Sequence, residues 1–481
     1  MAGIGFALRT LSGNDTLSSV VGAAGHAAVI AAGPWLFTIL SLAAITASAE
    51  PLAGYETLST FRAVIIYAFA TSLVLAAPIT IVATRLLADQ LWQRRTDLVR
   101  PLLVASMVLA VAVVSLGVLA LVLIFSVPVK LAIALFAATT VVAMIWVAVA
   151  FCGAVRDYNG ITLTFGVGLV IAVAGATAAA LTGLGAAGMV WGFTSGLTIT
   201  LLGLSFRVLA TFPIAGAAPF SQFHTLFRGF SKYAYLAAGT LFGTAGVWVD
   251  KWVFWFSREG QSVDGGLIHA PLYDSAMFIA SLVIIPALAQ FVVKLETDFF
   301  DRYQNYYGTI QDHGTIDQIE RSRERLQRNS FETLALIAVA HVAIAVVMVL
   351  AAPAIIESLN LQFRQIAILR YGALGSVFQF IFIAATSMVV FFDRRGWYCA
   401  LQVLFFSLNM LLTMLTISWG EDYYGVGYFS ASLISAALAL LVADRTFARL
   451  NYLTFIGNNP SITGTRRSPR AWLNQTIGWR A

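Results

Sequence analysis

A series of long apolar stretches is the feature that most constrains how this chain can fold. A helix of about 20 residues spans the roughly 30 Å hydrocarbon core of a bilayer, because each residue adds about 1.5 Å. The chain has 481 residues, of which 59% are hydrophobic and 11% charged, whereas soluble proteins carry about 25% charged residues. The sequence therefore predicts an all-α polytopic membrane protein with about 12 transmembrane helices. The predicted spans are 21–48, 62–88, 102–125, 130–152, 160–181, 186–209, 231–256, 271–294, 331–352, 365–392, 397–419 and 424–443.

Two six-helix bundles around a central cavity are the expected arrangement of these spans. The first helix of each half carries an A-G-x-W pattern, at 32–35 and again at 245–248. If this pattern marks an internal repeat, the halves are related by an axis along the membrane normal. Chance is an equal alternative, because three matching residues carry little information in so apolar a chain. The expected domains are an N-terminal bundle (1–225), a C-terminal bundle with a cytoplasmic helical loop at 295–330 (226–450), and a basic cytoplasmic tail (451–481).

Three prolines inside the predicted spans indicate kinks. Pro34, Pro78 and Pro286 each lack the N–H that a helix interior needs, and each clashes with the preceding turn. Kinked helices around a cavity suit alternating access, although packing in membranes also tolerates them.

The distribution of basic residues predicts that both termini are cytoplasmic. With the N-terminus inside, only six of the 29 lysines and arginines fall on the outer side. Cytoplasmic connections of membrane proteins are enriched in these residues. The net charge of +6 is therefore interpreted as a topology signal rather than as a sign of nucleic-acid binding. The six residues expected outside are Arg62, Lys130, Lys251, Arg258, Arg364 and Arg370.

The sequence argues against an enzyme. The longest connection, 295–330, is too short for a nucleotide-binding domain, and no G-x-x-x-x-G-K-[ST] loop is present. The five histidines show no i, i+4 pair that would hold zinc. His341 lies within a span and could serve an acyltransferase, but a packing role is more common for such a residue. We therefore expect no catalytic residue, no metal and no cofactor.

Ionisable residues inside the spans are the candidates for a substrate path, because an unpartnered charge in hydrocarbon costs several kcal/mol. Asp250 and Lys251 lie within the seventh span, and Asp274 opens the eighth. In one interpretation they line a water-filled path in which tryptophans contact the substrate. In the other, Lys251 extends to the interface and the aromatic residues form a belt there. The candidate path residues are Trp35, Trp248, Asp250, Lys251, Trp252 and Asp274.

The segment 284–310 is unusual, because an apolar helix continues into charged and aromatic residues without a stop signal. Helical spacing predicts ion pairs of Lys294 with Asp298 and of Asp298 with Arg302, beside an aromatic stripe. We expect the helix to project into the cytoplasm, to end at Gly308 and to be followed by a basic helix. It could dock a partner or form the mouth of the path, or it could lie on anionic headgroups. The candidate residues here are Glu296, Asp298, Asp301, Tyr303, Tyr306, Arg321, Arg323 and Arg325.

Several blocks of the sequence resemble the PelG family of inner-membrane exopolysaccharide transporters. These blocks are MAGIGFALR at the start, AAGPWL at 31–36, YDSAMFIASLVIIPALAQFVVKLETDFFDRYQNYYGTI at 273–310, FFDRRG at 391–396 and YYGVGYFSA at 423–431. The resemblance spans nearly the whole chain, and the block at 273–310 is the most specific. It implies a place in the superfamily of polysaccharide and multidrug exporters, which fold as two six-helix bundles around a cavity. It also implies the bacterial inner membrane.

The resemblance further implies a substrate and partners. The expected substrate is an amino-sugar-rich, partly cationic polysaccharide of the Pel type, made by a PelF-like cytoplasmic glycosyltransferase. A PelD-like cyclic-di-GMP receptor and a PelE-like membrane protein are the other expected partners. The candidate carboxylates could attract amino groups, and the tryptophans and tyrosines could stack on sugar faces. A flippase for lipid-linked oligosaccharides, a small-molecule antiporter of the same fold, and a non-transporting scaffold for the synthase remain alternatives.

Overall fold

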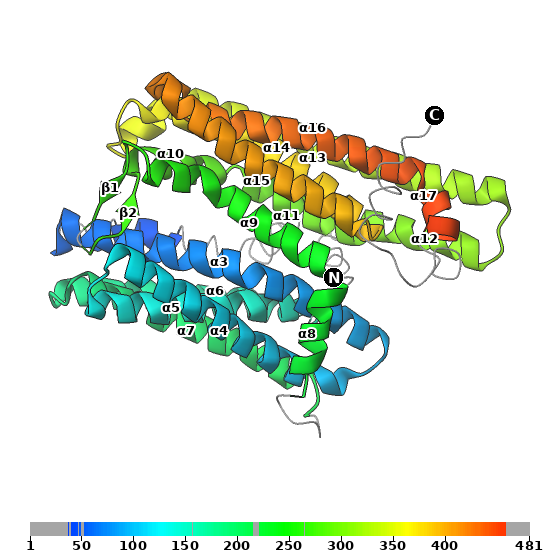
Figure 1. The fold of residues 1–481 in the computed structure, drawn as a ribbon, viewed down its shortest axis with the longest axis horizontal. Coiled ribbons are helices and arrows are strands. Elements are labelled where there is room, and N and C mark those ends of the chain that lie inside the picture. Colours follow the sequence, from blue (N-terminus) through cyan, green and yellow to red (C-terminus); the bar gives the residue numbers. More distant parts are fainter. Residues whose placement is uncertain are drawn as a thin grey trace.

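Long antiparallel helices form two bundles that lie side by side (Figure 1). This computed structural model describes residues 37, 40–46, 48–49, 52–155, 157–214, 221–263 and 265–457. Within these residues, 10 helices are long and apolar enough to cross a membrane, which confirms the prediction of a polytopic helical protein. The number twelve is not confirmed. The first predicted span lies mostly outside the described residues, and the seventh is a helix that is not among the 10.

The first bundle is formed by α3 to α7, drawn in blue to green-cyan in Figure 1. Its tightest pair is α6 with α7, which approach closely because glycines face each other. A Cβ added to Gly192 would lie only 2.3 Å from the carbonyl oxygen of Gly175. Small residues allow this close backbone approach between membrane helices. The bounds are α3 Tyr55–Trp92, η1 Thr96–Leu98, α4 Val99–Phe125, α5 Val129–Cys152, α6 Tyr158–Leu181 and α7 Gly185–Thr211.

The second bundle packs around α14, whose side chains are largely buried between α10, α13 and α16. Phe380 and Phe382 of α14 are fully buried, as is Phe405 of α15, so the core continues across the bundle. The bounds are α9 Ala234–Trp255, α10 Pro271–Ser281, α11 Ile284–Lys294, α13 Ile316–Ser358, α14 Gln365–Phe391, α15 Arg395–Trp419, η3 Glu421–Tyr423, α16 Val426–Ala448, α17 Leu450–Tyr452 and η4 Leu453–Gly457.

The predicted kinks have different outcomes. The eighth predicted span is divided into α10 and α11, and Pro286 is the third residue of α11. Because proline has no N–H and crowds the turn before it, the break at Leu282 and Val283 has a physical cause. Pro78 lies inside α3, which continues through it. Pro34 lies outside the described residues.

The two bundles are connected at both ends. The short helix α8, Phe223–Lys232, leads from the first bundle to the second, and it spans the predicted domain boundary at 225 (Figure 1). At this α8 end, Asp89 of α3 accepts hydrogen bonds from Lys232 Nζ at 3.2 Å and from the Tyr233 hydroxyl at 2.9 Å. The opposite end, which we name the β-hairpin end, carries the antiparallel strands β1, Gln261–Ser262, and β2, Ile268–His269.

The two ends of the molecule carry the two groups of basic residues that the sequence predicts for opposite sides of the membrane. The β-hairpin end holds the six predicted outer residues, including Arg62 in the early turns of α3 and Lys130 at the start of α5. The α8 end holds the arginines that follow α3, begin α15 and lie in the first turns of α13.

A helical hairpin extends beyond the second bundle at the α8 end. A five-residue π-helix, η2 (Leu295–Phe299), joins α11 to α12, Phe300–Gln311, and α13 returns antiparallel to α12. The 43 residues of α13 correspond to a length of about 65 Å, roughly twice the hydrocarbon thickness. Its start is fixed by a capping box, in which Thr315 accepts from the Gln318 N–H and Gln318 accepts from the Thr315 N–H.

The expected helix end at Gly308 is wrong, because α12 continues to Gln311. The backbone reverses at His313, which has a left-handed φ of 57°, and the Gly314 N–H donates to the Thr309 carbonyl at 2.9 Å. A glycine within a helix is tolerated, so the residues that reverse the chain determine the end.

Candidate functional site

Asp250 and Lys251 form an ion pair near the β-hairpin end of α9. The Asp250 side chain is fully buried, and its Oδ2 lies 3.1 Å from Lys251 Nζ. Tyr273, in the first turn of α10, donates its hydroxyl to the same oxygen at 2.9 Å. Lys251 Nζ also donates to the Val247 carbonyl at 3.1 Å. Two donors to the carboxylate offset the cost of removing its charge from water.

Asp274 lies close to this pair, in the first turn of α10. Its Oδ2 accepts from Trp255 Nε1 at 2.8 Å and from the Ala270 N–H at 3.0 Å. A carboxylate in the first turn is stabilised by the helix dipole and satisfies a free backbone N–H. The second oxygen, Oδ1, is buried and has no hydrogen-bond partner among the described residues. Asp274 therefore holds unused acceptor capacity next to the charged pair.

Two stacked aromatic pairs join α9 to its neighbours. Phe254 stacks on Tyr273 with ring centroids 3.7 Å apart, and Trp255 stacks on Tyr67 at 4.7 Å. Tyr67 also donates its hydroxyl to the Ile268 carbonyl in β2 at 2.7 Å. Because Tyr67 belongs to α3, these contacts hold the two bundles together at the β-hairpin end. We name the residues Tyr67, Asp250, Lys251, Trp255, Tyr273 and Asp274 the junction cluster.

The structure brings most of the candidate path residues to this cluster. Lys251 Nζ lies 5.9 Å from the centre of the Trp248 ring, within cation–π range. Trp252 is half-buried against the hydrophobic core. Trp35 lies outside the described residues. Sequence reasoning missed the roles of Tyr67 and Trp255, because nothing in the sequence shows that α3 and α9 meet.

The α12–α13 hairpin is fixed to α16 and α17 by a polar network. The buried Tyr306 donates its hydroxyl to Asn451 Oδ1 at 2.8 Å, and Asn451 Nδ2 donates to Glu320 Oε2 at 2.6 Å. Glu320 pairs in turn with Arg323 at 2.6 Å, and Arg323 Nη1 reaches the Phe447 carbonyl at 3.2 Å. The hydrogen bond from Arg323 lowers the pKa of Glu320. Tyr306 and Arg323, two predicted mouth residues, thus have structural partners.

The predicted aromatic stripe packs against the end of α14. Phe299 lies 5.0 Å from Phe391, and Tyr303 lies 6.2 Å from Phe392, measured between ring centroids. Burial raises the pKa of Tyr303 well above its usual range, and the neighbouring Tyr307 adds to the effect. The stripe explains why the helix continues past its apolar part, since the aromatic residues keep a buried face where the bundle ends.

The predicted charge pairs of this segment form only in part. Lys294 donates to Asp298 at 3.1 Å, as expected for i, i+4 spacing. The pair Asp298–Arg302 is not formed between these described side chains. Asp301 is half-buried at the start of α12. The side chain of Glu296 lies outside the described parts of the structure.

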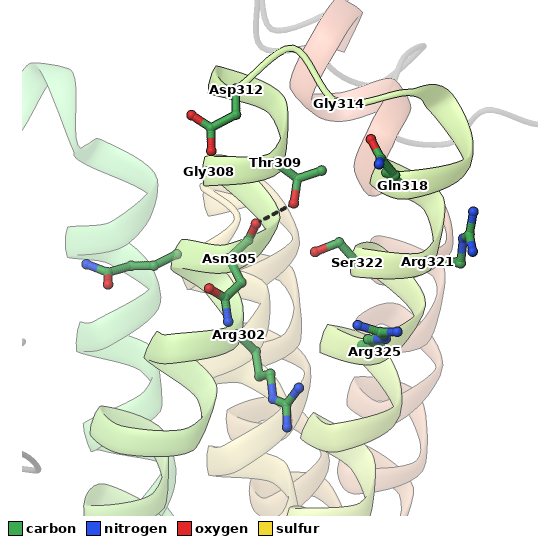
Figure 2. A pocket seen from close by; sticks show the side chains of 11 residues that line it. Arg302, Asn305, Gly308, Thr309, Asp312, Gly314, Gln318, Arg321, Ser322 and Arg325 are labelled. Atoms are coloured by element: carbon green, nitrogen blue, oxygen red, sulfur yellow. Dashed lines mark hydrogen bonds between the residues drawn. The ribbon is translucent and has the colours of Figure 1, made fainter.

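A polar groove of about 620 Å³ separates α12 from α13 (Figure 2). The candidate residues Arg321 and Arg325 line it from α13, and Arg302 lines it from α12. Figure 2 shows Ser322 between the two helices, with Asn305 and Thr309 on the facing helix. The arrangement offers cationic and neutral hydrogen-bond donors to a ligand outside the core of the bundle.

The arrangement of the helices defines a class of protein. Two bundles of membrane-length helices, which meet at a buried polar and aromatic cluster, are the framework of a multi-pass membrane transporter. The model of one protein family, PelG, matches residues 1–455 and is described as "Putative exopolysaccharide Exporter (EPS-E)". The chain belongs to this PelG family. No curated protein matches the sequence.

Solved structures of MATE transporters resemble this fold. The crystal structure of MATE in the straight conformation superposes with a TM-score of 0.63 at 14% identity, and the match covers 94% of this chain and 97% of that chain. The outward-facing conformation of a multidrug resistance MATE family transporter of the MOP superfamily gives 0.62 at 16% identity, covering 89% of this chain and 96% of that chain. Such low identities show a shared fold and carry no substrate information.

Proposed function

We propose that this protein exports an amino-sugar-rich exopolysaccharide across the bacterial inner membrane, with both termini in the cytoplasm. The observation that carries the proposal is the family match over residues 1–455 on a chain with a transporter fold. The basic residues at the α8 end support placing that end in the cytoplasm. The α12–α13 hairpin then projects into the cytoplasm, and the junction cluster lies toward the periplasm.

The proposed path runs between the two bundles. Their contact at the β-hairpin end, where Tyr67 of α3 stacks on Trp255 of α9, would close this path on the outer side. Export then requires these two rings to separate, as alternating access does in other transporters with two halves. Asp274 is the candidate to attract amino groups of the polymer, because its buried Oδ1 has no partner among the described residues. Trp248 and Trp252 are candidates to stack on sugar faces.

The proposed source of the polymer is a PelF-like glycosyltransferase that docks at the α12–α13 hairpin. A hairpin that extends beyond the bundle presents exposed charged residues to the aqueous phase, where such an enzyme would reach them. Arg321 and Arg325 are the docking candidates, whereas Tyr306 and Arg323 maintain the hairpin. PelD-like and PelE-like proteins complete the proposed complex.

The test of the path uses Asp274→Asn in a strain that depends on this protein for polymer export. Asparagine keeps an acceptor for Trp255 and Ala270 but removes the charge, so the amount of protein in the membrane should be unchanged. We expect secreted polymer to fall by at least about tenfold, which corresponds to the loss of one charge-assisted contact. Asp422→Asn, in the exposed η3, is the matched control. Normal secretion by Asp274→Asn would remove this residue from the path.

A second arm separates the alternatives. The charge reversal Arg321→Glu with Arg325→Glu should reduce co-purification of the glycosyltransferase, whereas Arg328→Gln, outside the groove, should not. A scaffold would need the docking residues but would tolerate Asp274→Asn. A flippase or an antiporter would keep transporting after the enzyme is lost. Only the exporter predicts that Asp274→Asn and the double arginine reversal both lose polymer secretion, while the reversal alone loses co-purification of the glycosyltransferase.

A further inference from the structure

We propose that the groove between α12 and α13 is a binding site for a phosphate-bearing ligand of about nucleotide size. The groove shares Arg321 and Arg325 with the proposed docking surface, whereas Arg302 belongs to this proposal alone. Ligand binding is measured on the chain without the glycosyltransferase, so the failure of either proposal can be distinguished from the failure of the other. The groove is formed by two helices that the Tyr306–Asn451–Glu320 network fixes to the bundle, and its walls are therefore positioned before a ligand arrives.

Three arginines give the groove its chemistry. Arg302 lines it from α12, and Arg321 and Arg325 line it from successive turns of α13 (Figure 2). Guanidinium groups bind phosphate oxygens through paired N–H donors, which makes arginine the preferred residue for such ligands. Arg321 uses one donor, Nε, on the Asp317 carbonyl at 3.1 Å. Arg302 and Arg325 have no ion-pair partner among the described residues, so their donors remain available.

Three carboxylates of α13 are occupied by arginines outside the groove. Glu320 and Glu324 both contact Arg323, at 2.6 and 3.8 Å. Glu332 pairs with Arg328 at 2.6 Å. Asp312 is the single carboxylate that lines the groove, against three arginines. The groove therefore keeps a net positive charge, which favours an anion.

The volume of the groove and its neutral polar side chains indicate a ligand larger than inorganic phosphate. The volume of about 620 Å³ lies within the range of small-molecule sites, about 300–1,000 Å³. Asn305, Thr309, Gln318 and Ser322 line the rest of the groove and can donate to or accept from hydroxyl groups or a base. The Thr309 hydroxyl donates to the Asn305 carbonyl at 2.8 Å and keeps its lone pairs for a ligand.

The distance of the groove from the predicted membrane span favours a soluble ligand over a lipid. Arg325 and Arg321 precede Phe331, the first residue of the predicted span, by six and 10 residues, or about 9 and 15 Å along the helix. The headgroup layer adds only about 5–8 Å to each side of the hydrocarbon. A lipid phosphate could reach Arg325, whereas a ligand from solution can reach all three arginines.

The test measures binding of uridine diphosphate, adenosine diphosphate and inorganic phosphate to the full chain by calorimetry. The protein is held in nanodiscs of neutral phosphatidylcholine. We expect saturable binding of the diphosphates that weakens with added salt. Arg302→Gln with Arg325→Gln should raise Kd by at least about tenfold. Ser322→Trp, which fills the groove without changing its charge, should do the same.

The control is Arg328→Gln, on the same helix but outside the groove, for which Kd should stay within about twofold of wild type. Melting curves must show that each variant is folded. A parallel arm uses nanodiscs with phosphatidylglycerol and measures lipid retention by native mass spectrometry. If the chain binds no diphosphate, and lipid retention falls only in the double arginine variant, the bound phosphate belongs to a lipid headgroup and the proposed soluble ligand is wrong. No binding in either arm, or equal binding by wild type and the double variant, overturns the proposal.

Discussion

Two ion pairs of the same length lie in opposite surroundings, one in the junction cluster and the other where α11 meets η2, at the base of the α12–α13 hairpin. Lys251–Asp250 and Lys294–Asp298 both have an N–O distance of 3.1 Å. The side chains of the first pair are 15% and 0% exposed, and those of the second are 53% and 40% exposed. Distance alone would rank the two pairs as equal. Burial separates them, because a charge in the core has only its protein partners, whereas an exposed charge also has water.

The comparison extends from the pairs to their settings. In the junction cluster, Asp250 also accepts from Tyr273, and the rings around it connect α9 with α3. In the hairpin, the aromatic side of α12 is packed and its charged side faces water. In the proposed export cycle the first region would change between two arrangements, and in the proposed complex the second would contact molecules from solution.

The largest expected effect comes from Lys251→Met. The change leaves Asp250 buried with Tyr273 as its remaining side-chain donor. Removing one partner of a buried pair costs about 3–5 kcal/mol, whereas the matched change Lys294→Met, in the exposed pair, should cost about 0–1 kcal/mol. The free energy of unfolding in detergent, followed by tryptophan fluorescence during denaturation, measures both.

A rescue experiment sharpens the same comparison. Adding Asp250→Asn to Lys251→Met removes the uncompensated charge, so most of the lost stability should return. Adding Asp298→Asn to Lys294→Met should change little. Equal losses for the two lysine variants would show that burial does not govern these pairs.

The sequence predicted the membrane helices because each one is a run of about 20 mostly apolar residues, a signal that is local and strong. It also singled out Asp250 and Lys251, since charges inside an apolar run are visible without a structure, and the structure shows the two as a buried ion pair. It did not identify the contact of Tyr67 with Trp255. Aromatic residues make up 12% of the chain, and which of them meet depends on how distant helices pack.

In the α12–α13 hairpin, too, the sequence could not show which residues meet distant helices. The sequence places Tyr306 and Arg323 in the same segment as the exposed arginines, and all of them were therefore predicted to form the mouth of the path or to dock a partner. Their burial depends on α16 and α17, which follow more than 100 residues later in the chain. The wrong end at Gly308 has a local cause, because the left-handed turn at His313 and Gly314 reverses the chain instead.

An intermediate effect is expected for Tyr306→Phe. The variant keeps the buried ring but leaves Asn451 Oδ1 without its donor. The network around it is less buried than the pair Lys251–Asp250 and more buried than the pair Lys294–Asp298. The free energy of unfolding should fall by about 1 kcal/mol, the net value of one hydrogen bond. Tyr452→Phe, at an exposed position of α17, should change it by less than about 0.5 kcal/mol. A loss as small as that of Tyr452→Phe would mean that the network contributes no stability.

The smallest effect concerns the pH dependence of His269, which lies in β2 between the bundles. Burial, and then the charge of Arg62, lower the pKa of His269 below its usual value. The unfolded chain therefore takes up a proton at this residue, near pH 6.5, before the folded chain does. Stability should decrease as the pH falls below about 6.5, until the folded histidine is also protonated.

His269→Gln should make this slope shallower, and the exposed His224→Gln on α8 is the matched control. Melting temperatures from pH 5 to pH 7.5 measure the slope, and the difference between wild type and variant isolates the contribution of His269. A slope that is the same in wild type and His269→Gln would mean that water reaches this side chain. The β-hairpin end would then be less tightly closed than the 3.5 Å contact between Ser59 Oγ and His269 Nε2 indicates, and the difference between the buried junction and the exposed hairpin would narrow.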